Sequence, residues 1–369
     1  MKVFIIAASL DERSGWGRYS RAVIDQLIVQ GMDVEVCSEP AAHPAYPTIS
    51  LRKLTSSPTI SFLLNMIRVR RAARDADIVH AFDGWPYAIY GWGAVVGTKK
   101  KLFTSGIATY SVPPRGYSLK RMLFRVAYGR ASKILSVSEY TKRRMIEGGV
   151  KPGKITVIHM GATPLPIINT EEFQKYAEQL SIERSSYPVV LTVGQVKDRK
   201  GQYETLRAVK SLRSTYPNIL YVMAGNQDAN YMQQIHKFIA EEQMERSVRF
   251  VQGADDRALS FLYLRCDLLA LNSNTDDHNI HFEGFGLSVI EGYQFAKPAV
   301  GSAESGVQEA IQDSVTGLHS KQGDSEDIAH KIELILEGYE TYSNNAKAAY
   351  KNYSWKDTVE AYIREYRRD

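Results

Sequence analysis

Two glutamates eight positions apart, Glu283 and Glu291, enclose a glycine-rich segment suited to binding an anion. The residues between them are Gly-Phe-Gly-Leu-Ser-Val-Ile. The glycines allow close approach of the backbone to a ligand, and Ser288 with Glu291 three positions later has the spacing of a capping box at a helix start. Because the first amides of a helix are unpaired donors at the positive end of its dipole, the segment predicts a phosphate site preceded by Glu283.

The same residues also fit two other interpretations. Glu291 can serve only as a helix cap while Glu283 is solvated, and spacing alone does not separate this from a ligand site. A hydrolase-type carboxylate pair is less favoured, because its two groups must face each other across a sugar at about 5–10 Å. One glutamate in a loop and one inside the next helix do not suggest that geometry.

The run from Glu283 to Glu291 resembles the E-x7-E motif of the retaining nucleotide-sugar glycosyltransferases with the GT-B fold, family four, also called glycosyl transferases group 1. The resemblance implies that Glu283 is the catalytic residue beside the transferred sugar and that Glu291 holds the ribose hydroxyls of the donor. It also implies that backbone amides between them hold the diphosphate. The donor-binding residues implied in this run are Phe285, Gly286, Leu287, Ser288 and Glu291.

A cationic loop follows the apolar run 188–194 and precedes a helix predicted at 203–212. Open α/β sheets bind ligands at such strand ends, although a solvated basic turn fits the composition equally. The resembled family has G-R-x(4,5)-K-G here, which implies that Lys200 neutralises the donor phosphates. The position of the family's arginine holds Gln195, and we expect Arg199 to substitute for it.

The loop after the first predicted strand contains Gly15, Gly17 and Arg18 in the order G-W-G-R-Y. A tight turn explains the glycines equally well, and the lack of a full G-x-G-x-x-G fingerprint argues against a dinucleotide site. In the resembled family this loop lies against the donor diphosphate or the acceptor. That implies a donor contact for Gly17 and acceptor or loop contacts for Gly15 and Arg18, while the backbone at Gly253 is implied to meet the nucleobase.

The chain departs from the family at a histidine that related glycosyltransferases often carry beside the donor sugar. Two alignments of the segment 102–114 place either Ile107 or Ser105 at that position. Together with Gln195, this departure keeps other functions open. They are weakened or altered transferase activity, a non-catalytic nucleotide-sugar-binding homologue, and a sugar-nucleotide epimerase or glycoside phosphorylase of the same fold.

Length and composition favour a two-domain α/β protein. The chain has 369 residues, of which 44% are hydrophobic and 24% charged, as in ordinary globular proteins. Its alternating strands and helices predict two doubly wound Rossmann-like domains, and the resemblance implies that these face an interdomain cleft. We expect an N-terminal acceptor-side domain at 1–165, a linker at 166–187, a C-terminal nucleotide-sugar domain at 188–345 and, by the resemblance, a helix at 346–369 that crosses back to the first domain.

Positive charge is concentrated in the first half of the chain. Residues 1–165 hold 24 Lys and Arg against 11 Asp and Glu, whereas residues 166–369 hold 22 against 30. Amphipathic helices with several basic residues are predicted at 60–73 and 118–130, and the second fits either a solvated face or an interfacial helix on anionic lipid. Nucleic acid, an anionic membrane surface and a phosphorylated substrate all fit this charge, but the lack of a nucleic-acid-binding motif disfavours the first.

The remaining signals concern compartment and metal. Only two cysteines occur, Cys37 and Cys266, which indicates a reducing compartment rather than a disulfide or zinc framework. The chain start reads as a buried strand rather than a signal peptide, and no stretch approaches the roughly 20 apolar residues of a membrane span. We expect a cytoplasmic protein that can work at the inner face of the membrane.

The polar loop 274–281 contains aspartates and histidines whose spacing matches no known metal site. These residues are Asp276, Asp277, His278 and His281. We therefore expect no metal and, by the resemblance, no cofactor. The reaction implied by the resemblance is retaining transfer of a hexosyl unit from a UDP- or GDP-linked sugar to a sugar or lipid-linked hydroxyl acceptor, in polysaccharide, lipopolysaccharide or glycolipid assembly.

Overall fold

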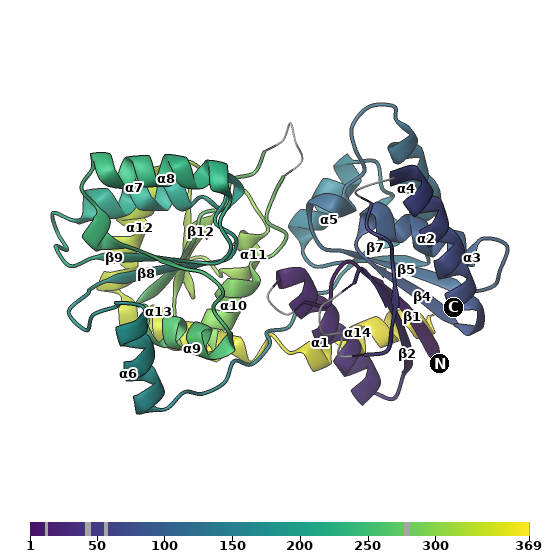
Figure 1. Cartoon of the computed structure of the whole chain (residues 1–369), viewed down its shortest axis with the longest axis horizontal. Helices are drawn as coiled ribbons and strands as arrows, with labels where there is room; N and C mark the ends of the chain where they lie inside the picture. Colours follow the sequence, from purple (N-terminus) through teal and green to yellow (C-terminus); the bar gives the residue numbers. More distant parts are fainter. Residues whose placement is uncertain (12–13, 41–45, 55–57, 277–280, 369) are drawn as a thin grey trace. The chain divides into compact units, whose positions relative to one another are not determined.

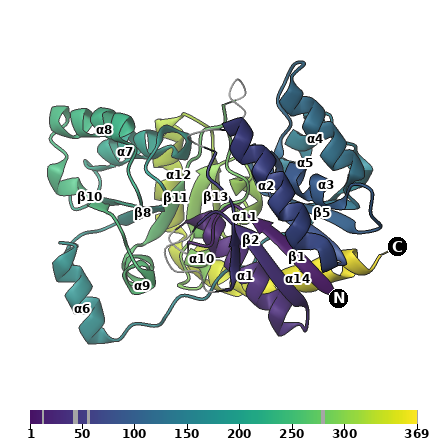
Figure 2. The same cartoon turned by 45° about the vertical axis from the view of Figure 1, so that its right-hand side comes forward.

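The computed structural model describes residues 1–11, 14–40, 46–54, 58–276 and 281–368. They form two compact units: a first unit of residues 1–161 with 353–369, and a second unit of residues 162–352. Each unit is a parallel sheet with helices on both faces (Figures 1 and 2). The prediction of two doubly wound α/β domains is therefore confirmed. Among the described residues, no helix combines the length and the apolar character that crossing a membrane requires.

The first unit is built on seven described strands in the order β3-β2-β1-β4-β5-β6-β7. Helices cover both faces of a parallel sheet, which explains why its central strands are apolar along most of their length. The strands are β1 (Lys2–Ala7), β2 (Asp33–Ser38), β3 (Thr48–Ser50), β4 (Ile78–Phe82), β5 (Lys101–Gly106), β6 (Lys133–Ser136) and β7 (Ile155–Val157). The helices are α1 (Gly15–Val29), α2 (Pro58–Ala72), α3 (Ile89–Val95), α4 (Leu119–Arg130), α5 (Glu139–Glu147) and α14 (Trp355–Arg367), with short turns η1 (Ala73–Asp75), η2 (Gly84–Ala88), η3 (Thr109–Ser111) and η4 (Pro152–Lys154).

Strand β4 shows how the two faces of this sheet differ. Successive side chains of a strand point to opposite faces. Val79 and Ala81 lie beside Gly91 of α3, whereas His80 meets Tyr366 of α14. Helices α2 and α4 both contact α3, and α1 contacts α14. The sheet is therefore covered by α3 with its neighbours on one face and by α1 with α14 on the other (Figure 1).

The second unit is built on six described strands in the order β10-β9-β8-β11-β12-β13. These are β8 (Val189–Val193), β9 (Leu220–Ala224), β10 (Val248–Val251), β11 (Leu268–Leu271), β12 (Ala299–Ser302) and β13 (Gly317–Ser320). The helices are α6 (Thr170–Gln179), α7 (Gln202–Leu212), α8 (Ala229–Glu241), α9 (Asp256–Arg265), α10 (Leu287–Tyr293), α11 (Val307–Ala310), α12 (Ser325–Glu337) and α13 (Tyr339–Tyr350), with short turns η5 (Asp198–Lys200) and η6 (Glu245–Ser247).

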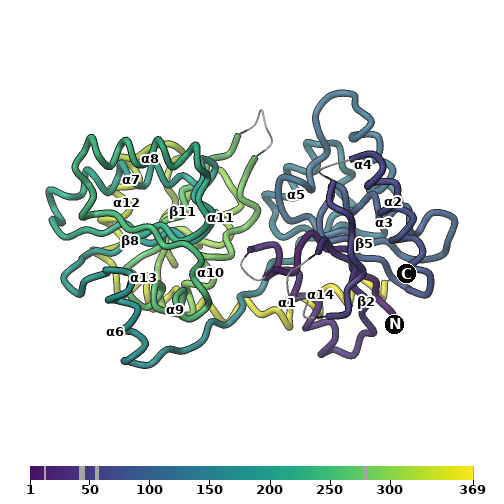
Figure 3. The backbone as a smooth tube through the Cα atoms, in the orientation of Figure 1, coloured from purple at the N-terminus to yellow at the C-terminus, as the bar shows by residue number. Residues whose placement is uncertain are grey.

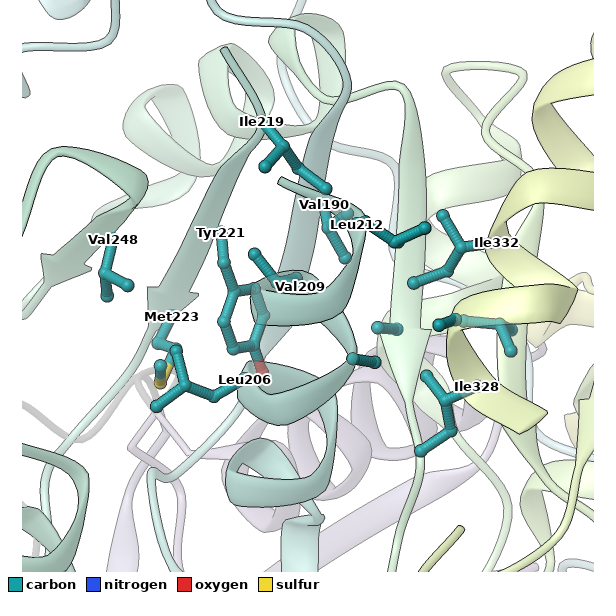
Figure 4. Packing of buried hydrophobic residues seen from close by; sticks show 14 of the residues in the cluster. Val190, Leu206, Val209, Leu212, Ile219, Tyr221, Met223, Val248, Ile328 and Ile332 are labelled. Atoms are coloured by element: carbon teal, nitrogen blue, oxygen red, sulfur yellow. The ribbon is translucent and has the colours of Figure 1, made fainter. Parts of the chain in front are cut away.

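A buried hydrophobic cluster holds α7 and α12 on one face of the second sheet (Figure 4). Tyr221 of β9 lies against the α7 side of this cluster, and its hydroxyl is 2.9 Å from Thr192 Oγ1 of β8. Burying this apolar surface fixes the direction in which α7 leaves the sheet. The residues labelled in Figure 4 are Val190, Leu206, Val209, Leu212, Ile219, Tyr221, Met223, Val248, Ile328 and Ile332.

Helix α14 is tied to the first unit by a buried chain of polar groups. The Tyr362 hydroxyl lies 2.9 Å from the Tyr19 hydroxyl of α1, and the Tyr366 hydroxyl lies 2.5 Å from His80 Nδ1. Ser105 Oγ of β5 joins the two pairs, because it lies 3.0 Å from His80 Nε2 and 2.6 Å from the Tyr19 hydroxyl. Buried polar groups require such partners, so the network specifies how α14 seats on the sheet.

The unit boundaries differ from the sequence-based domain boundaries. The predicted linker at 166–187 contains α6, which has a complete capping box formed by Asn169 and Glu172 and packs Phe173 on Phe261 of α9. The predicted helix at 346–369 is two helices, since α13 ends in the second unit and α14 begins in the first. The chain therefore changes units at 161–162 and again at 352–353.

The buried His80 predicts an acid-sensitive first unit. Burial lowers the pKa of His80 from 6.5 to about 3, so between these values the unfolded chain binds a proton that the native state does not. The stability contributed by this group is fully present above pH 6.5 and is lost as the pH falls toward 3, by about 1.4 kcal/mol per pH unit. We expect His80→Gln to remove this dependence of the free energy of unfolding on pH.

Tryptophan fluorescence during urea unfolding measures this effect, because all four tryptophans lie in the first unit. The exposed His330→Gln in the second unit is the matched control and should keep the wild-type slope. An unchanged slope in His80→Gln would show that the native His80 titrates like the unfolded one.

Candidate functional site

A left-handed glycine positions the cationic loop at the carboxyl end of β8. Gly201, between η5 and α7, has φ +66° and ψ 27°. A Cβ atom at this position would lie 1.8 Å from the carbonyl oxygen of Asn272, at the end of the neighbouring strand β11. Only glycine accommodates both the conformation and the close approach. Gly201 therefore fixes Lys200 beside the adjacent strand end.

Asn272 holds this junction together from inside the second unit. Its side chain is buried, its Nδ2 donates to Thr205 Oγ1 of α7 at 3.0 Å, and its Oδ1 accepts from Ser320 Oγ of β13 at 2.8 Å. Thr205 Oγ1 in turn donates to the Gly201 carbonyl oxygen at 2.9 Å. The ends of β11 and β13 and the first turn of α7 are thus joined by one satisfied polar network. Nothing in the sequence marks Asn272 for this role, since a polar residue after a strand carries no specific signal.

Glu283 is brought to the same loop although it lies more than eighty positions further along the chain. Its Oε2 accepts from Lys200 Nζ at 2.6 Å and from Arg199 Nη1 at 2.7 Å. Arg199 Nη1 also donates to the Phe282 carbonyl oxygen at 3.0 Å. The structure therefore places three of the predicted site residues, Arg199, Lys200 and Glu283, in direct contact.

The electrostatics of this cluster keep Glu283 ionised. Its side chain is only 17% exposed, and burial alone would raise its pKa. The charges of Lys200 and Arg199 outweigh that effect and lower the pKa of Glu283 to about 2. Burial lowers the pKa of Lys200, and the Glu283 carboxylate opposes this shift.

The cluster is suited to binding a further anion. Two cations share one carboxylate oxygen, so the three side chains carry a net charge of +1 when all are ionised. A guanidinium has five donor hydrogens and an ammonium three, and both contacts of Arg199 given above use the same nitrogen, Nη1. A phosphate oxygen placed here would meet two charge-assisted donors in a partly desolvated position, where such bonds are strong.

The backbone that carries Glu283 is fixed by a second close approach. The Gly306 amide donates to the Glu283 carbonyl oxygen at 2.8 Å. A Cβ atom on Gly306 would lie 2.1 Å from the Gly284 carbonyl oxygen. The segment preceding α11 therefore packs directly on the 283–284 backbone, and α10 and α11 contact each other (Figure 3). Gly306 positions Glu283, a role that its spacing in the sequence did not reveal.

The predicted capping box of Ser288 and Glu291 is wrong. Helix α10 begins at Leu287, and its N-cap is Gly286 with φ +114° and ψ 52°. Glu291 is therefore the fifth helical residue and cannot reach the helix start. Instead its side chain is buried, and the Tyr263 hydroxyl lies 3.0 Å from both Glu291 Oε2 and the Ser288 carbonyl oxygen.

The other predicted site residues lie at the starts or ends of regular elements. In the second unit, Gly253 follows β10 with φ +64° and open space where a Cβ would be, and Phe285 is buried. In the first unit, Ser14 caps α1, and its Oγ accepts from the Gly17 amide at 3.0 Å. A Cβ atom on Gly17 would lie 1.9 Å from the Asp11 carbonyl oxygen. That close contact explains why position 17 needs glycine, whether or not a ligand binds there. Gly15 and Arg18 flank Gly17 in the first turn of α1.

The two candidate positions for the family histidine have distinct surroundings. Ser105 is part of the buried network with His80 and Tyr19. Ile107 is buried, and its amide donates to Ser111 Oγ at 2.9 Å. Ser111 also donates to the buried Asp83, whose pKa is raised to about 7 by burial. Neither position offers an imidazole.

The structure describes only part of the polar loop 274–281, where no metal is expected. Asp276 and His281 are joined by backbone hydrogen bonds of 2.8 and 3.0 Å, and Asp277 and His278 lie outside the described residues. Within the described ranges, no group of three or more His, Cys, Asp or Glu side chains is arranged to hold a metal ion.

Gly201→Ala tests whether close approach, rather than backbone conformation alone, makes this glycine necessary. A non-glycine residue in the left-handed region costs about 1–2 kcal/mol, and the contact with Asn272 adds to this cost. We expect Gly201→Ala to reduce the free energy of unfolding of the second unit by at least twice as much as Gly323→Ala. Gly323 is the matched control, because it has φ +78° and nothing within 4 Å of its Cβ position. Equal losses in urea unfolding, followed by circular dichroism, would contradict the close-approach argument.

Comparisons with known proteins agree with this architecture. A family model described as "Glycosyl transferases group 1" matches residues 174–352, and one described as "Glycosyltransferase Family 4" matches residues 13–164. An uncharacterized glycosyltransferase of Methanocaldococcus jannaschii is 22% identical over 310 residues, which are 81% of this chain and 78% of that protein. The N,N'-diacetylbacillosaminyl-diphospho-undecaprenol alpha-1,3-N-acetylgalactosaminyltransferase of Campylobacter jejuni is 26% identical over 234 residues, which are 62% of this chain and 57% of that protein.

Solved structures show the same fold over almost the whole chain. HepE of Anabaena, solved in complex with UDP and glucose, gives a TM-score of 0.80 at 20% identity and covers 99% of this chain and 98% of its own. A glycosyltransferase from Rickettsia africae gives a TM-score of 0.82 at 18% identity, with 99% and 97% covered. With family models matched on both units and this fold throughout, the chain belongs to the group 1 glycosyltransferases, enzymes of the two-domain GT-B fold.

Proposed function

We propose that this glycosyltransferase moves a hexosyl unit from a UDP- or GDP-linked sugar to a hydroxyl acceptor, with retention at the anomeric carbon. The observation that carries the proposal is the ion-paired cluster of Glu283 with Lys200 and Arg199. The UDP found with HepE supports a nucleotide donor. The name of the Campylobacter jejuni relative includes a diphospho-undecaprenol acceptor, which supports a sugar or lipid-linked acceptor in polysaccharide, lipopolysaccharide or glycolipid assembly.

The two cations would stabilise the leaving nucleoside diphosphate. Breaking the bond between the sugar and the diphosphate leaves negative charge on the phosphate oxygens. Preorganised cations at that position lower the energy of the transition state more than that of the ground state. Lys200 and Arg199 are already held in place by the Glu283 carboxylate and the Phe282 carbonyl oxygen. With this charge supplied by side chains, we propose a metal-independent reaction without a cofactor.

Glu283 would act on the sugar side of the same bond. Its pKa of about 2 keeps it ionised at neutral pH, so it can accept a hydrogen bond from a sugar hydroxyl and oppose positive charge developing at the anomeric carbon. Donor phosphate arriving at Lys200 and Arg199 would compete with Glu283 for these cations, which frees carboxylate lone pairs for the sugar. Binding of the donor and activation of Glu283 are thus one event.

The remaining contacts are proposed by resemblance to the family. Glu291 would accept hydrogen bonds from the ribose hydroxyls, and the backbone of the run Phe285, Gly286, Leu287 and Ser288 would hold the diphosphate. The backbone at Gly253 would meet the base. In the first unit, Gly17 would contact the donor and Gly15 with Arg18 the acceptor side.

A donor screen tests the proposal. Purified protein is given UDP-, GDP- and ADP-sugars together with sugar and lipid-linked acceptors, and release of nucleoside diphosphate is followed. We expect release from one donor class, and a loss of at least about a hundredfold in kcat for Glu283→Gln, the usual range for removing one transition-state stabilising group.

Glu337→Gln, an exposed substitution at the end of α12, is the matched control and should keep wild-type turnover. Thermal stabilisation by a nucleotide without release from any donor would contradict the transfer reaction, although not nucleotide binding. Full activity in Glu283→Gln would remove Glu283 from the proposed role.

A rescue experiment tests whether Arg199 replaces the family's arginine. Gln195 is exposed and lies in the same loop. We expect Arg199→Gln to raise the KM for the donor roughly tenfold or more through the lost charge-assisted bonds, and the double change Arg199→Gln with Gln195→Arg to restore most of it. A double variant as impaired as Arg199→Gln alone would show that the two positions are not interchangeable. Gln195→Arg alone serves as the control for added charge.

A further inference from the structure

Helix α2 buries two polar residues and exposes a stripe of apolar ones. The buried residues of its inner face are Ser61, Asn65 and Val69. Asn65 is satisfied there, because its Oδ1 accepts from the Arg52 amide at 2.8 Å and its Nδ2 donates to the Arg52 carbonyl oxygen at 2.9 Å. The outer face carries four residues at helical spacing that are 37–61% exposed, namely Ile60, Leu63, Leu64 and Ile67. An ordinary surface helix turns such a stripe toward the core.

Helix α4 carries a second exposed apolar stripe. Its inner face packs through Phe124, Ala127 and Tyr128, as expected for a helix on a sheet. Its outer face nevertheless also presents large apolar side chains, which follow the exposed Tyr117 at the preceding turn. These are Leu119, Met122 and Val126, which are 40–69% exposed.

Trp85 lies between the two helices and contacts both. Its ring stacks on Phe62 of α2 with 5.6 Å between centroids and 16° between planes. On its other side it lies 6.4 Å from the Phe124 ring of α4, and Lys120 Nζ of α4 sits 4.9 Å from its centroid. Both helices also contact α3, so α2 and α4 cover the same face of the first sheet, and we refer to residues 60–67 and 117–126 with Trp85 as the α2–α4 face.

The sequence around this face contains basic and no acidic residues. Between Pro40 and Arg74 there are six Lys and Arg and no Asp or Glu, and between Gly84 and Ser138 there are nine and none. A hollow of about 430 Å³ beside α2 combines the apolar side chains of Leu64 and Ile67 with the guanidinium-bearing Arg52, Arg68 and Arg71. Apolar side chains ringed by arginines match the two layers of a phospholipid, its acyl chains and its phosphate.

We propose that the α2–α4 face docks on a bilayer containing anionic phospholipids. A bilayer covers the apolar residues and neutralises the cations at once. Nucleic acid would neutralise the charge but offers the isoleucines and leucines no acyl chains. A second copy of this chain, meeting the same face across a twofold axis, would bring like charges together. The proposal is independent of the transfer reaction, since it concerns a surface rather than the donor site.

Vesicle flotation without donor or acceptor tests the proposal. The full chain is mixed with vesicles of phosphatidylcholine alone, or with about one third phosphatidylglycerol. We expect binding to the anionic vesicles only. The variant Leu63→Ser with Ile67→Ser should weaken it roughly tenfold or more, because these side chains no longer enter the acyl region. The matched control is Ile28→Ser with Val29→Ser, which changes two exposed apolar residues of α1 and should bind as wild type.

The charge is tested separately. Arg71→Glu with Arg125→Glu changes one arginine on each helix and should abolish binding at physiological salt, whereas the exposed Lys347→Glu of α13 should not change it. Equal binding to neutral vesicles, or no effect of the serine variant, would overturn the proposal. So would an α2 variant that instead dissolves a dimer of the chain in gel filtration. Donor turnover measured on the same variants in detergent distinguishes a failed surface from a failed enzyme.

Discussion

One carboxylate oxygen shared by two cations is the interaction on which the candidate site depends. Burial disfavours the charge on Glu283 and on Lys200, and each of the two side chains favours the charged form of the other. Arg199 adds a second cation to the same oxygen. Removing one partner from such a cluster leaves an uncompensated charge in a poorly hydrated position, which is costly. The three side chains therefore behave as a unit, and the excess positive charge of that unit is what a diphosphate would meet.

The cluster exists because two glycines let backbones pass within contact distance. Gly201 lies against the Asn272 carbonyl oxygen and Gly306 against the Gly284 carbonyl oxygen. A methyl group at Gly201 would displace the loop that carries the cations, and one at Gly306 would displace the loop that carries Glu283. Either displacement would be large enough to break the hydrogen bonds of the cluster. The glycines near this site thus act first on the protein's own geometry. A glycine beside a charged motif in a sequence is compatible with close approach of a ligand. Here the contacts with the protein's own backbone are enough to explain why glycine is needed.

The features of the structure that the sequence predicts are those encoded locally. Apolar runs such as 188–194 identified buried parallel strands, and the order of strands and helices predicted the two doubly wound units. The contact between Glu283 and Lys200 was not predictable from spacing, because it depends on how two loops meet at neighbouring strand ends. The helix start at Leu287 was missed, because the positive φ of Gly286 makes that glycine the cap before Ser288 is reached. The linker prediction missed α6, whose capping box at Asn169 and Glu172 is visible in the sequence.

Helix α2 illustrates a limit of apolar periodicity as a guide to structure. The pattern at 60–73 correctly predicted an amphipathic helix, and the usual assumption places its apolar stripe against the core. Here the inner face buries Asn65 beside Val69, and the Asn65 amide pairs with both backbone groups of Arg52. Apolar periodicity shows only that apolar residues share one face of a helix. It does not show what covers that face. The apolar stripe of α2 therefore lies outside the core, and the surrounding excess of arginine supports an anionic bilayer as the environment that covers it.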